Sequence, residues 1–92
     1  MILEFRCADT RQLFEGQRVA RFVNIEAVAL RKLQQLNAAS SLRFLRVPPG
    51  NQLEPLQGDK AGLYSVRINS QWRLCFAWDE GHATQVAIVD YH

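Results

Sequence analysis

The sequence lacks the long apolar runs and the cysteine motifs that mark several classes of protein. No stretch of its 92 residues approaches the roughly 18–20 consecutive apolar residues of a membrane-spanning helix. Its two cysteines, Cys7 and Cys75, share no CxxC spacing and have no histidine cluster near them, which favours reduced thiols over a disulfide or a metal site. The first residues lack the basic and apolar regions of a signal peptide, so we expect a cytoplasmic protein without a membrane segment.

The composition is that of an ordinary globular protein. Hydrophobic residues make up 48% and charged residues 22% of the chain, which argues against disorder and predicts one domain over residues 1–92. The net charge is only +2, but residues 1–50 hold eight Lys or Arg against four Asp or Glu. Nine of the eleven cationic residues are arginine, which suits bidentate contact with phosphate. A solvated basic surface explains the same composition equally simply.

The first half of the chain reads as one short strand followed by helices. We expect a strand over Ile2–Phe5, a short helix capped by Asp9 and ended by Gly16, and a longer helix capped by Asn24. A further helical turn is predicted over Ser41–Arg46. The apolar residues of the longer helix recur at spacings of three and four, as one helical face requires: Phe22, Ile25, Ala29, Leu33 and Leu36.

In the second half the apolar period changes to two, which predicts strands. Residues 64–68 and residues 72–78 both alternate in this way. If residues 69–71 form the loop between them, all of their large apolar side chains share one face. The same register sets Arg67 directly opposite Arg73 on the other face. Like charges there destabilise by up to about 1 kcal/mol, unless both are solvated or an anion binds between them.

The chain ends in a third predicted strand and an unusual trio of side chains. Residues 84–91 are rich in strand-forming residues and follow a turn at residues 79–82. In a strand, Asp90 and His92 project to one face and Tyr91 to the other. A histidine can exchange a proton near neutral pH, and a neighbouring carboxylate can orient it. The sequence has no P-loop, GxGxxG, GxSxG or metal-ligand spacing, so we expect no cofactor and no metal.

Four segments of the chain together resemble a known family. Residues 53–62 read LEPLQGDKAG, residues 64–67 read YSVR, residues 71–76 read QWRLCF and residues 89–92 read VDYH. In this order they resemble HigB-type toxins, which belong to the RelE superfamily of bacterial type II toxin–antitoxin systems. The resemblance extends over nearly the whole chain.

The resemblance implies a fold and an activity. The expected fold is a small α/β (α+β) domain, with an N-terminal strand and two to three helices packed on a twisted, mostly antiparallel sheet. The expected activity is cleavage of messenger RNA in the decoding site of a translating ribosome. In that reaction the substrate's own 2′-OH attacks the adjacent phosphate without a metal and leaves a 2′,3′-cyclic phosphate. Such a reaction needs a base, an acid and a cation at the developing phosphorane charge.

The resemblance also assigns roles to individual residues. Arg73 would stabilise the phosphorane charge. The residues implied to position RNA or handle protons are Asp90, Tyr91, His92 and Glu54. The residues implied to bind RNA phosphates are Arg67, Lys60 and Gln57.

Two positions depart from the family pattern. Glu54 stands where the family often has histidine, and Gln57 stands where it often has lysine. Glu54 can serve as a base if burial raises its pKa, whereas Gln57 can hydrogen-bond phosphate but cannot neutralise it. We therefore expect a weaker nuclease, as in the HigB subgroup called GraT, which this chain also resembles.

The resemblance implies partners and leaves two alternatives open. The implied partners are a HigA-like antitoxin with a helix-turn-helix domain, the ribosome and its mRNA, with DNA reached only through the antitoxin. One alternative is a ParE-like toxin, which shares the fold and inhibits its target by binding without catalysis. The other is a plain RNA-binding module, for which a net charge of +2 is weak support.

Overall fold

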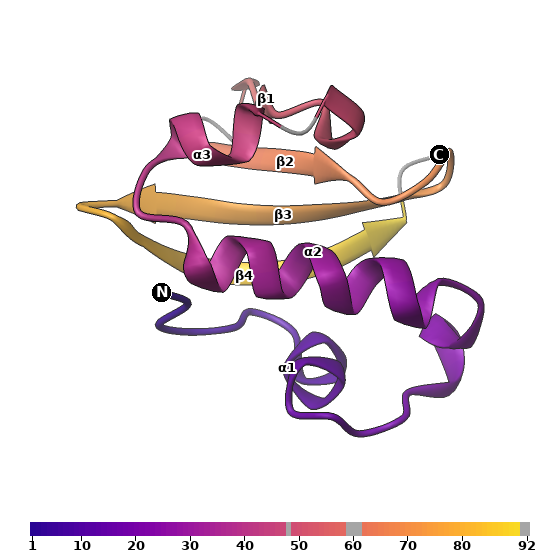
Figure 1. The fold of residues 1–92 in the computed structure, drawn as a ribbon. Helices are drawn as coiled ribbons and strands as arrows, with labels where there is room; N and C mark the ends of the chain where they lie inside the picture. The colour runs from indigo at the N-terminus through magenta and orange to yellow at the C-terminus, as the bar shows by residue number, and fades with distance from the viewer. Residues whose placement is uncertain (48, 59–61, 91–92) are drawn as a thin grey trace.

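A computed structural model of the protein describes residues 1–47, 49–58 and 62–90. Within these residues, helical elements come first and strands follow. Figure 1 shows α2 running along one side of the sheet with α1 beside it, which confirms the predicted α+β class. The elements are α1 (Ala8–Phe14), the 3₁₀ helix η1 (Ala20–Ile25), α2 (Glu26–Ala38), α3 (Leu42–Arg46), the 3₁₀ helix η2 (Pro49–Asn51), β1 (Glu54–Pro55), β2 (Leu63–Arg67), β3 (Trp72–Asp79) and β4 (His82–Asp90).

The described strands form one antiparallel sheet in the order β1-β2-β3-β4. The register of the central hairpin is the predicted one, with Val66 opposite Leu74 and Arg67 opposite Arg73. The Ile68 N–H donates to the Trp72 carbonyl at 3.0 Å and closes the hairpin around its loop. The alternation of apolar residues therefore fixed this pairing, because a slip of one residue would expose the buried face.

The pairing of β3 with β4 contains a β-bulge. The register shifts between Cys75 and Ala77, and Gln85 on β4 has a left-handed backbone with φ of 53°. Without the extra residue, the pairing that starts from the turn would point Val86 and Ile88 away from the helices. The bulge turns both into the core, where Val86 is fully buried and Ile88 is 2% exposed.

The helices confirm the predicted apolar face and correct the predicted caps. The five residues of the predicted face are all buried. However, Cys7 is the N-cap of α1, and Asp9 lies within its first turn without a capping hydrogen bond. Asn24 caps nothing, because η1 runs through it and continues directly into α2, whose N-cap is Ile25. Gly16 follows α1 as predicted, with φ of 93°, a conformation that favours glycine.

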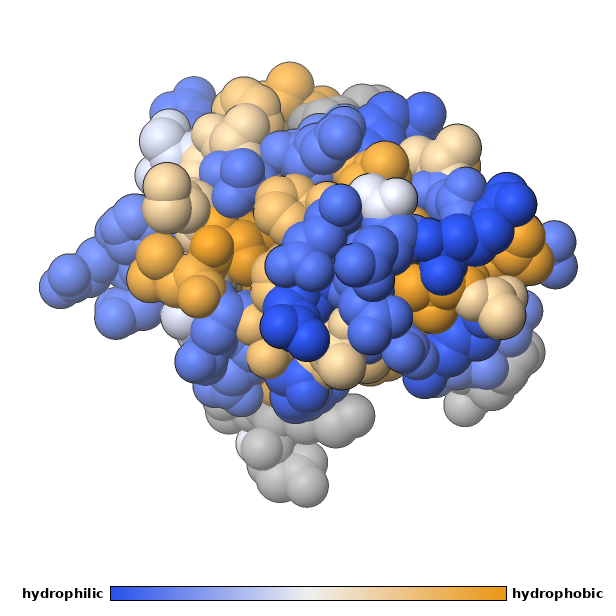
Figure 2. All heavy atoms as spheres, turned by 90° about the horizontal axis from the view of Figure 1, so that it is seen from below, coloured by the Kyte–Doolittle hydropathy of each residue, from blue (hydrophilic) through white to orange (hydrophobic). Residues whose placement is uncertain are grey.

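The N-terminal segment covers the outer edge of β4. Instead of the predicted strand, Ile2 and Phe5 form single parallel bridges with Ala83 and Val86. Backbone N–H groups of the segment donate to the carbonyls of these two residues at 2.8 and 3.0 Å. The pairing protects β4 from edge-to-edge association. Figure 2 shows this side of the molecule as largely hydrophilic with separate apolar areas.

No helix among residues 1–47, 49–58 and 62–90 is long and apolar enough to cross a membrane.

The core lies between the helices and one face of the sheet. The sixteen residues of the buried apolar cluster come from the helices, from all three long strands and, for Val19, Ala39 and Ile68, from positions directly beside these elements: Leu13, Val19, Phe22, Ile25, Ala29, Leu33, Leu36, Ala39, Leu45, Val66, Ile68, Leu74, Phe76, Ala83, Val86 and Ile88.

Candidate functional site

Arg73 lies on the face of the sheet opposite the helices, because its neighbour Leu74 points into the core. Its side chain is nevertheless only 9% exposed. Its Nε donates to Ser65 Oγ at 2.8 Å, and its Nη2 donates to the Gln52 carbonyl at 2.7 Å. Glu54 Oε1 lies 3.9 Å from the same Nη2. This guanidinium is therefore held in one orientation, which excludes the alternative that both arginines of the pair are solvated.

Arg67 provides a second positive charge on the same face. It lies directly opposite Arg73 across β2 and β3, as predicted, and is half-buried. Two like charges at opposed positions of a sheet repel each other, and the Glu54 carboxylate offsets only part of that charge. A phosphate group on this face would be attracted by both guanidinium groups.

Glu54 reaches Arg73 because β1 extends the sheet by one more strand. Glu54 pairs with Ser65, and Ser65 pairs with Cys75, so all three share the face of Arg73. The Glu54 side chain is 57% exposed. The burial that would make Glu54 a base is therefore absent, and its carboxylate lies beside a guanidinium.

Asp90 projects toward the opposite face of the sheet. It pairs with Trp72, whose ring packs on Phe22 of the helical layer, while Val89 pairs with Arg73. Gln71 Nε2 donates to Asp90 Oδ2 at 3.1 Å and connects the hairpin loop to the end of β4. The β-bulge decides this placement: without it, Asp90 would share the face of Arg73.

Four predicted site residues remain: Gln57, Lys60, Tyr91 and His92. Gln57 is exposed in the segment between β1 and β2. Lys60, Tyr91 and His92 lie outside the described residues. The structure thus brings together Arg73, Arg67 and Glu54 and sets Asp90 apart from them.

Two site residues carry little signal in the sequence. Ser65 is fully buried, and its hydroxyl accepts a hydrogen bond from the Arg73 Nε. In the sequence, this role is indicated only by a polar residue opposite a cysteine in an alternating strand. Gln52 contributes its backbone carbonyl rather than its side chain, and a backbone contact of this kind has no residue-type signal.

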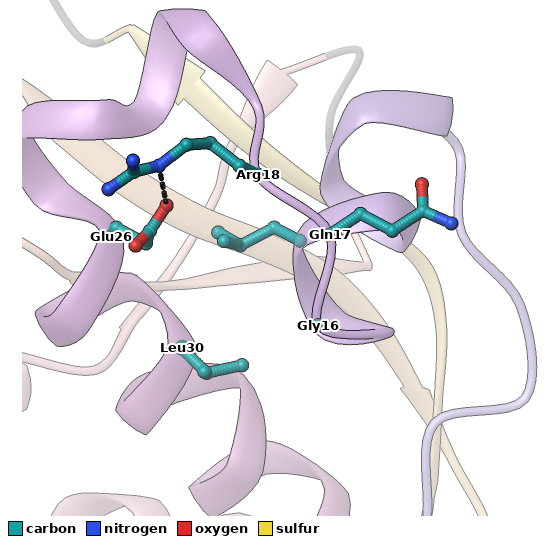
Figure 3. Close-up of a pocket in the computed structure, with 6 residues that line it drawn as sticks. Gly16, Gln17, Arg18, Glu26 and Leu30 are labelled. Atoms are coloured by element: carbon teal, nitrogen blue, oxygen red, sulfur yellow. Dashed lines mark hydrogen bonds and ion pairs between the residues drawn. The ribbon is translucent and has the colours of Figure 1, made fainter.

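A shallow pocket lies away from these residues, between the end of α1 and the beginning of α2 (Figure 3). Leu13 and Leu30 contribute its apolar part. Its charged groups, Arg18 and Glu26, pair with each other at 3.5 Å. None of the predicted site residues lines it, and we assign it no chemistry.

Metal-ligating side chains do not gather into a metal site among the described residues. These residues contain no group of three or more His, Cys, Asp or Glu side chains that could hold a metal ion. Neither Cys7 nor Cys75, both within the described part of the chain, forms a disulfide.

Comparison with known proteins identifies the family. Residues 3–92 match the sequence profile of the RelE-like toxin of type II toxin–antitoxin system HigB. The chain belongs to this family. It is 41% identical to Toxin HigB-1 of Vibrio cholerae over 85 residues, which cover 90% of each protein. It is 37% identical to a protein of Proteus vulgaris named Endoribonuclease HigB over 41 residues, or 45% of each chain.

A solved structure supports the same fold. The YoeB-YefM complex from Staphylococcus aureus contains a chain that matches all of this HigB-family protein with a TM-score of 0.58. The match covers 95% of that chain at 21% sequence identity, which establishes a common fold and no more. The RelE-like fold expected from the sequence is confirmed. As a type II toxin, the protein has a cognate antitoxin.

Proposed function

We propose that this HigB-family toxin is an endoribonuclease that cuts messenger RNA on the translating ribosome. The observation that carries the proposal is the arrangement of Arg67, Arg73 and Glu54 on one sheet face, with Arg73 locked by Ser65 and by the Gln52 carbonyl. A preorganised guanidinium costs little reorganisation when phosphate charge develops beside it. The enzyme name of the Proteus vulgaris relative agrees with this chemistry.

The proposed reaction is an internal displacement at phosphorus. The ribose 2′-oxygen loses its proton to a base and attacks the adjacent phosphorus atom. The bond from phosphorus to the 5′-oxygen breaks, and that oxygen takes up a proton. The products are a 2′,3′-cyclic phosphate and a 5′-hydroxyl, with no metal taking part. Arg73 stabilises the added negative charge of the phosphorane, and Arg67 binds a backbone phosphate.

Proton transfer and phosphate binding fall to the other predicted residues. We propose that Tyr91 and His92 position the RNA and move protons. Asp90 projects to the face opposite Arg73 and is anchored by Gln71, so we propose that it positions the RNA at the end of β4. Lys60 and Gln57 add phosphate contacts. Glu54 competes with phosphate for Arg73, because its carboxylate already lies 3.9 Å from the guanidinium.

This competition supports a weakened, GraT-like nuclease. An anion that approaches Arg73 must displace a carboxylate or share the guanidinium with it. A neutral or basic side chain at position 54 would remove that competitor. Glu54→Gln should therefore bind phosphate groups more tightly, and faster cleavage would show that Glu54 is not the essential base.

The proposed partners follow from the reaction and the family. The enzyme acts in the cytoplasm on mRNA held in the ribosomal decoding site. A HigA-like antitoxin with a helix-turn-helix domain holds it inactive and provides any contact with DNA.

Mapping of RNA 5′ ends after brief expression without the antitoxin tests the proposal. We expect new ends within translated regions, in phase with codons, together with arrested growth. Purified protein should cut mRNA on programmed ribosomes and leave the same RNA intact when ribosomes are absent. Growth arrest without new RNA ends would favour a ParE-like binding toxin, and equal cutting of naked RNA would overturn the ribosome dependence.

His92→Gln tests the proposed proton transfer. Glutamine keeps a polar side chain but cannot exchange a proton near neutral pH. We expect cleavage to fall while ribosome binding is retained. Full cleavage by this variant would shift proton transfer to Tyr91 or Glu54.

A further inference from the structure

A buried polar cluster connects the three helical elements α2, α3 and η2. Lys32 on α2 donates from Nζ to Asn51 Oδ1 at the end of η2. Asn51 Nδ2 in turn donates to the Leu45 carbonyl of α3 at 3.0 Å and to Gln35 Oε1 at 3.4 Å. Lys32 is 8% exposed and Asn51 is fully buried. The cluster therefore fixes the position of η2 against α2 and α3.

The residue after Asn51 is the one that holds Arg73. Gln52 has a left-handed backbone with φ of 45°, which is unfavourable for a residue with a Cβ. Such a conformation persists when the surrounding contacts determine it. Asn51 is anchored on one side of it, and the Gln52 carbonyl accepts a hydrogen bond from Arg73 Nη2 at 2.7 Å on the other.

The guanidinium is thus held from two independent directions. Ser65 on β2 accepts from Nε through its hydroxyl at 2.8 Å and, more distantly, from Nη2 through its carbonyl at 3.4 Å. The Gln52 carbonyl accepts from Nη2 at 2.7 Å, which is the shorter of the two Nη2 contacts. The contacts with Ser65 belong to the sheet. The contact with Gln52 depends on the loop that Lys32 and Asn51 anchor, so the orientation of Arg73 depends on residues of the helical layer.

If the side chain at position 32 served only to pack the core, a lysine would destabilise the fold relative to an apolar residue. Burial of an ammonium group is unfavourable, and burial together with the positive charge of Arg31 lowers the pKa of Lys32. An apolar side chain of similar length would fill the same space without that cost. The hydrogen bond to Asn51 is what an apolar side chain could not supply.

We propose that Lys32 and Asn51 are positioning residues for Arg73. They hold the Gln52 carbonyl where it orients the guanidinium toward the reacting phosphate. The proposal rests on the proposed nuclease function, in which Arg73 touches the phosphate and Lys32 and Asn51 do not.

The first test is a double-mutant cycle on the cleavage step. Lys32→Met, Asn51→Leu and Arg73→Ala are made singly and in pairs, and single-turnover cleavage on saturating programmed ribosomes is measured well below the melting temperature. We expect Lys32→Met and Asn51→Leu to slow cleavage roughly 10- to 100-fold with ribosome affinity unchanged. In the Arg73→Ala background, neither should slow cleavage further.

The matched control is Arg31→Met, which removes a cation from the neighbouring, exposed position of α2. It should leave the cleavage step unchanged. Multiplicative effects of Lys32→Met and Arg73→Ala would overturn the proposal, because a general loss of folded protein acts independently of Arg73. So would an unchanged cleavage rate in both single variants.

A second measurement does not depend on catalysis. The Arg73 Nε–H resonance in a ¹⁵N-correlated spectrum, assigned by its loss in Arg73→Lys, reports how firmly the guanidinium is held. We expect Asn51→Leu and Lys32→Met to shift or broaden this signal, with Lys32→Leu replacing Lys32→Met if the latter does not fold. Arg31→Met should leave the signal in place. An undisturbed signal in both variants would overturn the positioning role. A disturbed signal in a protein that cuts no RNA would instead place the failure in the proposed function.

Discussion

At the scale of single residues, the opposed arginines have different surroundings. Arg73 is almost completely buried and hydrogen-bonded to Ser65 and Gln52, whereas Arg67 is half-buried. The sequence predicted that they lie opposite each other, but it did not predict that their burial differs. Arg73 therefore belongs to the hydrogen-bonded interior, whereas the Arg67 side chain is partly open to solvent.

The two arginines should therefore respond differently to substitution. Arg73→Ala leaves the buried Ser65 hydroxyl and Gln52 carbonyl without their donor, so we expect a loss of about 1–3 kcal/mol in the free energy of unfolding. Cleavage should also fall by roughly 10²-fold or more. Arg67→Ala should leave stability unchanged or slightly higher, because it relieves like-charge repulsion.

Urea titration and single-turnover cleavage of the two variants check this prediction. Equal stability losses in both would show that Arg67 is also structural. Wild-type cleavage by a folded Arg73→Ala variant would remove the proposed role of Arg73 in the reaction.

The buried Lys32 predicts a characteristic pH dependence of stability. Its pKa in the folded protein lies below 10.5, its ordinary value, because of burial and the charge of Arg31. Between the folded and the ordinary pKa, the unfolded chain binds more protons, so the stability contributed at this position rises with pH. We expect the free energy of unfolding of the wild type, minus that of Lys32→Met, to increase up to about pH 10.5 and then level off.

Urea titrations of both proteins across the alkaline range measure this difference, and other titrating groups cancel in the subtraction. A flat difference would show that Lys32 titrates as it does in the unfolded chain. A falling difference would indicate that the fold favours the charged ammonium form.

At the scale of elements, α1 is attached to β4 by one buried hydrogen bond. The Thr10 Oγ1 accepts from the backbone N–H of Ile88 at 3.0 Å, and Thr10 is fully buried. This contact follows the bridges that the N-terminal segment makes with the same strand. A side chain on a helix thus completes the hydrogen bonding of a strand edge.

Thr10→Val should test how much this contact stabilises the fold. Valine keeps the shape but leaves the buried Ile88 N–H without an acceptor, so we expect a loss of about 1–3 kcal/mol in the free energy of unfolding. Hydrogen exchange at the Ile88 amide should accelerate more than exchange at the Leu74 amide of β3. Thr10→Ser keeps the acceptor and serves as the control. If Thr10→Val matched the wild type in stability, water or another group would have to satisfy Ile88.

At the scale of the whole molecule, charge is distributed unevenly along the chain. Residues 1–50 carry an excess of positive charge, whereas residues 51–92, which form the sheet, hold three Lys or Arg against five Asp or Glu. The proposed site is therefore a local concentration of arginine in an otherwise acidic half. Under the proposed function, we therefore expect the helical half to supply long-range attraction to RNA and the sheet to supply the contact with phosphate.

This distribution predicts how ribosome binding depends on salt. Affinity should fall steeply as the salt concentration rises, because bound cationic groups release counterions from RNA. Arg67→Ala should reduce the slope of the logarithm of affinity against the logarithm of salt concentration by about one. Binding measured at several salt concentrations checks this. Arg31→Met, which removes a cation from residues 1–50, serves for comparison. An unchanged slope for Arg67→Ala would place Arg67 outside the RNA contact.

The sequence by itself determined the parts of this protein that depend on local periodicity. The buried face of α2 and the register that opposes Arg67 and Arg73 follow from apolar residues spaced for a helix or a strand. These patterns are strong because a slip in either would expose the whole apolar set to water. The family followed from short motifs in a fixed order, and residues 3–92 match it.

Only the tertiary structure decided which polar groups meet. The β-bulge at Gln85 sends Asp90 to the face opposite Arg73, since one inserted residue reverses the face of every residue after it. The backbone carbonyl that Arg73 binds lies twenty-one residues away in the sequence, and Asn51 beside it accepts a hydrogen bond from Lys32, nineteen residues before Asn51. A carbonyl is common to every residue type, so no sequence pattern marks the one that a distant arginine will bind.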